Sequence, residues 1–142
     1  MNFLSFIFTA LLLFATQLHA HCQIPCGVYD DTMRVKMIEE HTLTILKSMN
    51  YIASNQNDLE QQNQVTRWIM NKEEHAQEIQ NIVSEYFLTQ RIKSSSKDYE
   101  KLLKGAHSVM VAAMKCKQST EASAAKDLKS SILAFQKIYG SK

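Results

Sequence analysis

The chain has 142 residues, three glycines, one proline and a formal net charge of +2. This length leaves room for one domain. The near-neutral charge shows no sign of the concentrated basic face that nucleic-acid-binding proteins usually carry, so we expect no nucleic-acid partner. Because β-rich folds need many turns, and turns rely on Gly and Pro, the composition predicts long helices joined by few connections.

Residues 1–20 have the composition of a cleaved export signal. They contain no Asp, Glu, Lys or Arg, and the stretch 3–15 is apolar except for Ser5 and Thr9. This run is shorter than the about 20 apolar residues that a membrane span needs, and it has the length of a signal-peptide core. We expect a processing peptidase to cleave after Ala20 and the mature chain to lie outside the membrane. An N-terminal membrane anchor or a buried helix is the alternative.

Cleavage there would create a set of metal ligands at the new N-terminus. His21 would carry a free α-amine and an imidazole, and Cys22 and Cys26 supply two thiolates. The amine, the backbone amide nitrogen of Cys22 and its thiolate form two fused chelate rings, and the second thiolate completes a planar N2S2 set. Planar N/S donors suit Ni(II) or Cu(II) rather than Zn(II), which prefers a tetrahedron.

The spacing of the cysteines alone leaves other interpretations open. A Cys22–Cys26 disulfide is reasonable in an exported protein, and a Cys-x-x-x-Cys redox pair is another reading of the same residues. Two rival functions accompany these alternatives. One is an exported helical-bundle protein that binds Ni or Cu without turnover, and the other is a secreted helical ligand stabilised by that disulfide.

The segment His21-Cys22-Gln23-Ile24-Pro25-Cys26-Gly27-Val28-Tyr29 resembles the N-terminal hook of nickel superoxide dismutases. The resemblance implies a right-handed four-helix bundle assembled as a homohexamer. It implies one nickel per subunit, bound by the His21 amine and imidazole, one backbone amide and two thiolates. The enzyme would convert two superoxide anions and two protons to dioxygen and hydrogen peroxide through a Ni(III)/Ni(II) cycle.

The resemblance also bears on where the protein matures. The leader favours export to the extracellular space, the periplasm or an organelle lumen. Family members, however, are often made with a prosegment that a dedicated protease removes, sometimes without leaving the cytosol. A cytoplasmic location is therefore the alternative if residues 1–20 are a prosegment.

Residues outside the ligand set receive roles from the same resemblance. Tyr29 corresponds to a tyrosine beside the open face of the nickel, where its hydroxyl holds waters or the incoming anion. Matching Lys72-Glu73 to the family puts His75 where the family has an arginine that orients the hook imidazole. Arg67, two turns earlier, is the nearest arginine and partly substitutes in this interpretation. An ordinary solvated arginine is its alternative.

Two further positions depart from the family pattern. Met37 stands where the family often has a glutamate on the first helix, and Glu39 or Glu40 is the expected substitute. Gln23 replaces an aspartate that is common in the hook. These departures affect the surroundings of the predicted nickel site more than its ligands.

The remainder of the chain predicts four amphipathic helices. Asp30-Asp31-Thr32 offers N-cap residues for the first helix, and polar breaks at 54–58, 94–96 and 118–120 separate the others. Short links between amphipathic helices are typical of up-down bundles. We therefore expect an all-α, antiparallel up-down four-helix bundle with an extended N-terminal metal-binding hook. The expected divisions are the leader at 1–20, the nickel hook at 21–30 and the bundle at 31–142.

Several other side chains are expected at the surface or in the packing of the bundle rather than in the metal site. His41 and His107 are expected at the surface or its boundary rather than as metal ligands, because no pair of histidines has the close helical spacing of a di-metal site. Cys116 is expected as a half-buried apolar residue, with intermolecular pairing as the alternative. Lys72 is expected on a solvated helix face.

Overall fold

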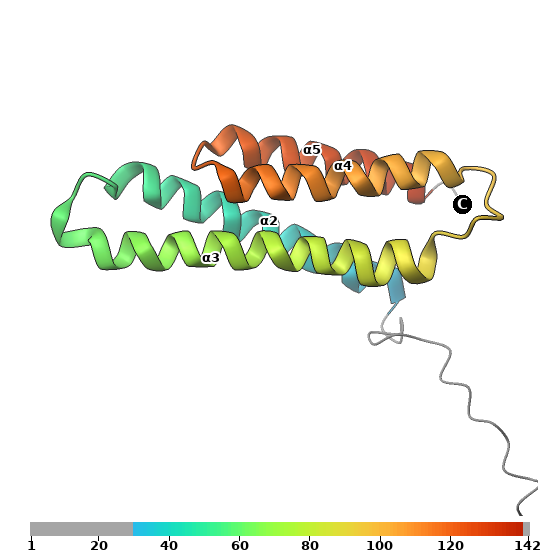
Figure 1. The fold of residues 1–142 in the computed structure, drawn as a ribbon, viewed down its shortest axis with the longest axis horizontal. Helices are drawn as coiled ribbons and strands as arrows, with labels where there is room; N and C mark the ends of the chain where they lie inside the picture. The colour runs from blue at the N-terminus through green and yellow to red at the C-terminus, as the bar shows by residue number, and fades with distance from the viewer. Residues whose placement is uncertain (1–29, 141–142) are drawn as a thin grey trace, which may run out of the picture.

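The computed structural model describes residues 30–140, which form a bundle of four long helical rods (Figure 1). The π-helix η2 continues α3 directly, so the two form one rod. In chain order the elements are α2 (Asp30–Asn55), the 3-10 turn η1 (Leu59–Gln61), α3 (Gln62–Asn81), η2 (Ile82–Arg91), α4 (Tyr99–Gln118) and α5 (Ala122–Tyr139).

Each helix packs against its neighbours in the chain, and α5 returns to pack against α2. The helices run antiparallel (Figure 1). The prediction of an all-α, antiparallel up-down four-helix bundle is therefore confirmed for the described residues. The leader, the hook at 21–29 and the divisions predicted around them lie outside those residues. None of the described helices is both long enough and apolar enough to cross a membrane.

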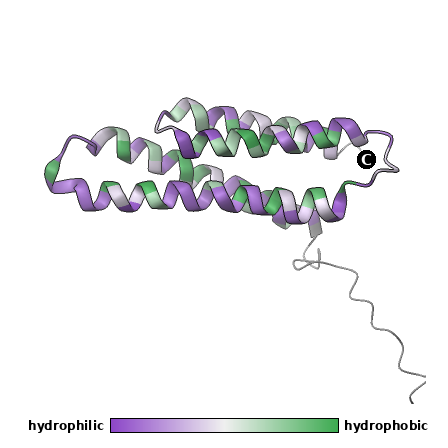
Figure 2. Ribbon diagram, in the orientation of Figure 1, coloured by the Kyte–Doolittle hydropathy of each residue, from purple (hydrophilic) through white to green (hydrophobic). Residues whose placement is uncertain are grey.

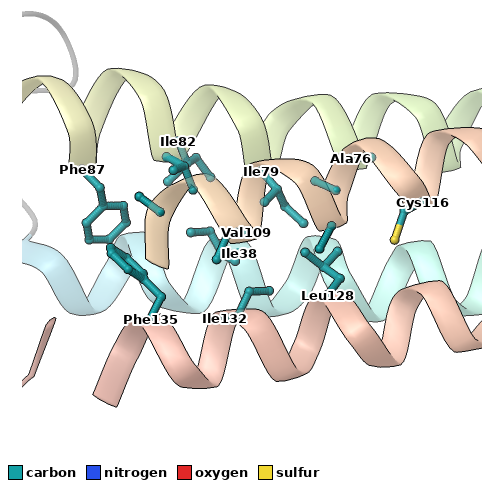
Figure 3. Close-up of a cluster of buried hydrophobic side chains, with 14 of the residues drawn as sticks. Ile38, Ala76, Ile79, Ile82, Phe87, Val109, Cys116, Leu128, Ile132 and Phe135 are labelled. Atoms are coloured by element: carbon teal, nitrogen blue, oxygen red, sulfur yellow. The ribbon is translucent and has the colours of Figure 1, made fainter. Parts of the chain in front are cut away.

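The core follows from the interleaving of apolar and polar residues along each helix (Figure 2). Apolar side chains that recur every three or four residues form one stripe, which each helix buries against the other helices. Ile38 of α2, Val109 of α4 and Ile132 of α5 lie together in this interior (Figure 3). The largest fully buried apolar side chains are Tyr86, Phe87, Ile45, Met49, Ile79, Leu102 and Leu128.

The rod formed by α3 and η2 changes from α-helical to π-helical at Ile82. The backbone N–H of Ile92 donates to the carbonyl of Phe87, five residues earlier, at 2.9 Å. In an α-helix, residues five apart point about 140° away from each other. In a π-helix the hydrogen-bonded turn spans five residues, so such residues share nearly one side. Arg91 consequently lies over Tyr86, with its guanidinium carbon 5.5 Å from the ring centroid.

Lys72 is buried, and the expectation of a solvated lysine is wrong. Its side chain is 2% exposed. The ammonium donates to the carbonyl oxygens of Cys116 at 2.7 Å and Lys117 at 2.6 Å, and to Glu73 at 2.7 Å. Both carbonyls belong to the last turn of α4, where carbonyl groups have no partner within the helix. A cation there also interacts favourably with the helix dipole. Lys72 therefore joins α3 to the end of α4.

The capping role of Lys72 predicts a large stability effect. Lys72→Met keeps most of the apolar stem but leaves two carbonyls and the Glu73 carboxylate without the ammonium. We expect the free energy of unfolding to fall by roughly 2–4 kcal/mol, measured by urea denaturation of the metal-free protein. Lys101→Met removes an ammonium that is 72% exposed and pairs with Asp98, and should cost less than about 1 kcal/mol. Equal losses in the two variants would contradict the role of Lys72.

Candidate metal centre

The predicted metal ligands His21, Cys22 and Cys26, together with Tyr29, lie outside the described residues. The structure shows where the chain that follows them enters the bundle. Helix α2 begins at Asp30, at the end of the bundle where η2 and α5 finish (Figure 1). Five residues span at most about 17 Å. A metal bound to Cys26 would therefore lie within roughly 20 Å of Asp31.

Asp31 gathers three polar side chains at this end of the bundle. Its Oδ1 accepts hydrogen bonds from the Tyr86 hydroxyl at 2.5 Å and from Arg91 Nε at 2.8 Å. Arg91 Nη2 lies 2.7 Å from the same oxygen, and the Tyr139 hydroxyl donates to Oδ2 at 2.7 Å. We call these four residues the Asp31 cluster. It joins the start of α2 to η2 and to the last residue of α5.

The protonation states of the Asp31 cluster follow from these contacts. Burial raises the pKa of the Asp31 carboxyl, but the hydrogen bonds from Tyr86, Tyr139 and Arg91 outweigh this effect and hold that pKa below its ordinary value. Burial, followed by the bond to Asp31, raises the pKa of Tyr139 to about 12 and raises the pKa of Tyr86. At neutral pH the cluster therefore contains a carboxylate, a guanidinium and two protonated phenols.

Sequence reasoning missed the Asp31 cluster. Asp31 was expected as one of the cap residues of the first helix, a role that would have used its side chain locally. Its partners are 55, 60 and 108 residues away in the chain. No motif spacing connects residues at such separations, so only the packing of the bundle reveals the cluster.

Arg34 lies beside the Asp31 cluster, one turn further along α2. Its guanidinium carbon is 5.4 Å from the ring centroid of Tyr86, and Nη1 lies 3.5 Å from the sulfur of Met37. Its Nε is buried and has no hydrogen-bond partner among the described residues. Arg34 thus contacts the methionine that stands in place of the family's glutamate. Glu39, an expected substitute, accepts a hydrogen bond from Gln136 of α5 at 3.1 Å.

His75, predicted to support the hook imidazole, is paired with His41. Their Nδ1 atoms are 2.8 Å apart, and their rings are tilted by 59° with centroids 4.9 Å apart. Both histidines are half-buried and link α3 to α2. Because Nδ1 of His75 is already hydrogen-bonded to His41, the imidazole of His21 would have to bind Nε2 of His75. Ten residues of helix separate His41 from Asp31, about 15 Å, so His75 lies at a distance that the hook can reach.

Arg67 is exposed and lies far from the start of α2. The next residue, Trp68, packs against Tyr51 with ring centroids 5.3 Å apart. Tyr51 follows Asp31 by 20 residues of helix, about 30 Å. That distance exceeds the roughly 20 Å within which a metal on Cys26 must lie. Within one chain, His75 is therefore better placed than Arg67 to contact the imidazole of the hook. The role of Arg67 stays a prediction, and it would require Arg67 to contact the hook of a neighbouring copy.

Cys116 is fully buried in the core rather than half-buried. Burial raises the pKa of its thiol to about 11, so the sulfur stays protonated at neutral pH. A protonated, inaccessible thiol is a poor metal ligand and a poor partner for intermolecular pairing. His107, by contrast, is exposed as expected. Residues 30–140 contain no group of three or more His, Cys, Asp or Glu side chains that could hold a metal ion.

The His41–His75 pair predicts a loss of stability in acid. Burial and the charge of His75 lower the pKa of His41, against a smaller opposing effect of Glu78 and Glu40. The unfolded chain then binds this proton more readily than the folded protein. The contribution to stability is therefore full above about pH 6.5 and declines as the pH falls below it.

Urea denaturation of the metal-free protein at pH 8 and pH 5.5 measures this effect. His41→Gln should reduce the difference between the two pH values, because its side chain cannot take up the proton. His107→Gln changes an exposed histidine and should keep the wild-type difference. An unchanged pH dependence in H41Q would contradict the assignment.

Comparison with known proteins identifies the family. A family model described as nickel-containing superoxide dismutase matches residues 16–142. No curated protein and no solved structure matches the chain. The matched range begins before the hook and includes all the described helices. The chain therefore belongs to the nickel-containing superoxide dismutase family, whose members are oxidoreductases that use nickel to dismutate superoxide.

Proposed function

We propose that removal of residues 1–20 activates this superoxide dismutase by freeing the α-amine of His21. In the precursor, the peptide bond from Ala20 occupies that nitrogen, so the ligand set is incomplete. The observation that carries the proposal is the hook sequence that begins at His21, inside the matched family range. We propose that the mature chain binds one nickel through His21, Cys22 and Cys26.

The donor set fits nickel on chemical grounds. Two thiolates, an amine and a backbone amide would supply nitrogen and sulfur donors, which suit Ni(II). When bound, nickel supplies one-electron redox chemistry at a potential that thiolate donors make accessible. The His21 imidazole would complete the ligand set. In the overall reaction one superoxide is oxidised to dioxygen, and a second is reduced with two protons to hydrogen peroxide.

We propose that Tyr29 positions the substrate. It follows Cys26 by three residues, and its hydroxyl would hold waters or the incoming anion beside the metal. The end of the bundle at which α2 begins carries the guanidinium groups of Arg34 and Arg91, both close to the ring of Tyr86. Positive charge near the site attracts superoxide, which is an anion.

We further propose a homohexamer that matures after export. The likeness of the hook to the family supports the hexamer. An apolar groove between α2 and α5 includes Leu43 and Leu133, which are 63% and 54% exposed. Such side chains offer apolar surface for contact with another copy. The uncharged, apolar stretch at 3–15 supports an export signal, which a peptidase would remove.

The decisive experiment compares two chains that differ only at the N-terminus. One begins at His21 and the other at Ala20, so the side chains of the hook are identical and only the position of the amine changes. The chain that begins at His21 should bind one nickel per subunit, show a Ni(III) EPR signal and dismutate superoxide. The chain that begins at Ala20 should lose more than about 100-fold in activity, since changing groups that only support a ligand already costs 10–100-fold.

Three outcomes would oppose the proposal. Nickel binding without dismutation would favour a metal carrier. A Cys22–Cys26 disulfide in a protein that binds no nickel would exclude the ligand set. Equal activity of the two chains would show that the His21 amine is not a ligand. Cys22→Ser and Cys26→Ser serve as controls that remove one thiolate each.

A further inference from the structure

We propose that Asp31 is a positioning residue for the nickel hook: through Tyr86, Arg91 and Tyr139 it fixes where the hook leaves the bundle and in which direction. This inference rests on the proposed function, because it assumes that residues 21–29 hold the nickel. Asp31 itself touches neither metal nor substrate in this proposal. It acts through the backbone that joins it to Tyr29, two residues earlier, and to Cys26, five residues earlier.

The first turn of a helix needs such a contact. Its first four backbone N–H groups have no partner within the helix, and a terminal turn has little stability of its own. A shift of this turn would carry the last metal ligand and Tyr29 with it. Because the proposed ligands come from one short segment, the position of that segment relative to the bundle would depend on how firmly the first turn of α2 is held.

The two tyrosines that bind Asp31 are held by packing against the core, whereas Arg91 is exposed. Tyr86 is fully buried and packs edge-on against Phe87, with ring centroids 5.2 Å apart. Tyr139 packs against Phe87 at 5.2 Å and against Phe135 at 5.6 Å. Aromatic rings in such contacts have few alternative rotamers. Their hydroxyls therefore hold the Asp31 carboxylate at a defined place, and bonds to a charged acceptor are short and strong.

The π-helix gives η2 the geometry that this arrangement requires. Tyr86 and Arg91 are five residues apart, and both bind Oδ1 of Asp31. With α-helical winding, Arg91 would point about 140° away from Tyr86. π-helical turns are rare and occur frequently at functional sites. In this protein the altered winding brings a phenol and a guanidinium to the same carboxylate, directly beside the residue at which the hook joins the bundle.

The arrangement also makes the end of the chain part of the hook's support. Tyr139 is the last residue of α5 and lies 108 residues after Asp31. Its hydroxyl is the contact that can be removed with the least disturbance, because Tyr139→Phe keeps the ring among Phe87 and Phe135. Asp31→Asn is the complementary change, since it keeps the shape of the side chain and removes its charge.

Tyr51→Phe is the matched control. The Tyr51 hydroxyl donates to Gln61 at 2.9 Å, and Tyr51 lies about 30 Å along α2 from Asp31. Y51F removes a hydroxyl that bonds to a neutral acceptor, so we expect a smaller shift of the urea midpoint than in Y139F, whose hydroxyl bonds to a carboxylate. Only Y139F and D31N should speed amide hydrogen exchange at residues 34–37 of the metal-free mature protein, because these N–H groups donate to the carbonyls of the first turn. Only these two should weaken nickel binding, by roughly 10-fold, and broaden the Ni(III) EPR signal.

The outcomes separate this proposal from the assignment of the ligands. If the wild-type chain that begins at His21 binds no nickel, the ligand assignment fails and this proposal fails with it. If the wild type binds nickel and folded Y139F and D31N match Y51F in nickel affinity, EPR signal and amide exchange, the Asp31 cluster only stabilises the fold and the positioning role is wrong. Should D31N fail to fold, Y139F alone decides between these results.

Discussion

The hydrogen bonds to the Asp31 carboxylate close one end of the bundle. Asp31 stands at the beginning of α2, and the side chains that bind it come from η2 and from the last residue of α5. A partly buried carboxylate is unfavourable unless charged or polar partners compensate for its lost hydration. Here two phenols and a guanidinium do so, and they join the start of α2, which directly follows the predicted hook, to η2 and α5. The opposite arrangement, a hook joined to a frayed helix, would leave its ligands poorly positioned.

The surroundings of the hook differ from those implied by the family resemblance. Met37 replaces a glutamate, and the structure places it beside the guanidinium of Arg34. His75 replaces an arginine, and the structure pairs it with His41. The position that the family gives to an arginine is thus taken by a histidine whose Nδ1 already contacts a second histidine.

Helix ends in this bundle are held by side chains from other helices. Lys72 of α3 binds the last carbonyls of α4, and Tyr139 of α5 binds the first turn of α2. A local C-cap would satisfy the carbonyls that Lys72 binds, but it would not join two helices. Because these contacts are between helices, they stabilise the ends and fix the relative positions of the rods at the same time.

The order of apolar and polar residues by itself determined the four helices and their antiparallel packing, because burial of an apolar stripe is a local pattern. The proposed donor atoms of the hook are likewise close together in the sequence, which is why a nickel-containing family was predictable from nine residues. The tertiary structure alone decided the Asp31 cluster, the His41–His75 pair and the burial of Lys72, since each joins residues at least 34 positions apart. It also decided the π-helical winding of η2, which an apolar pattern does not distinguish from a continued α-helix. That winding brings Tyr86 and Arg91 to the Asp31 carboxylate, beside the start of α2.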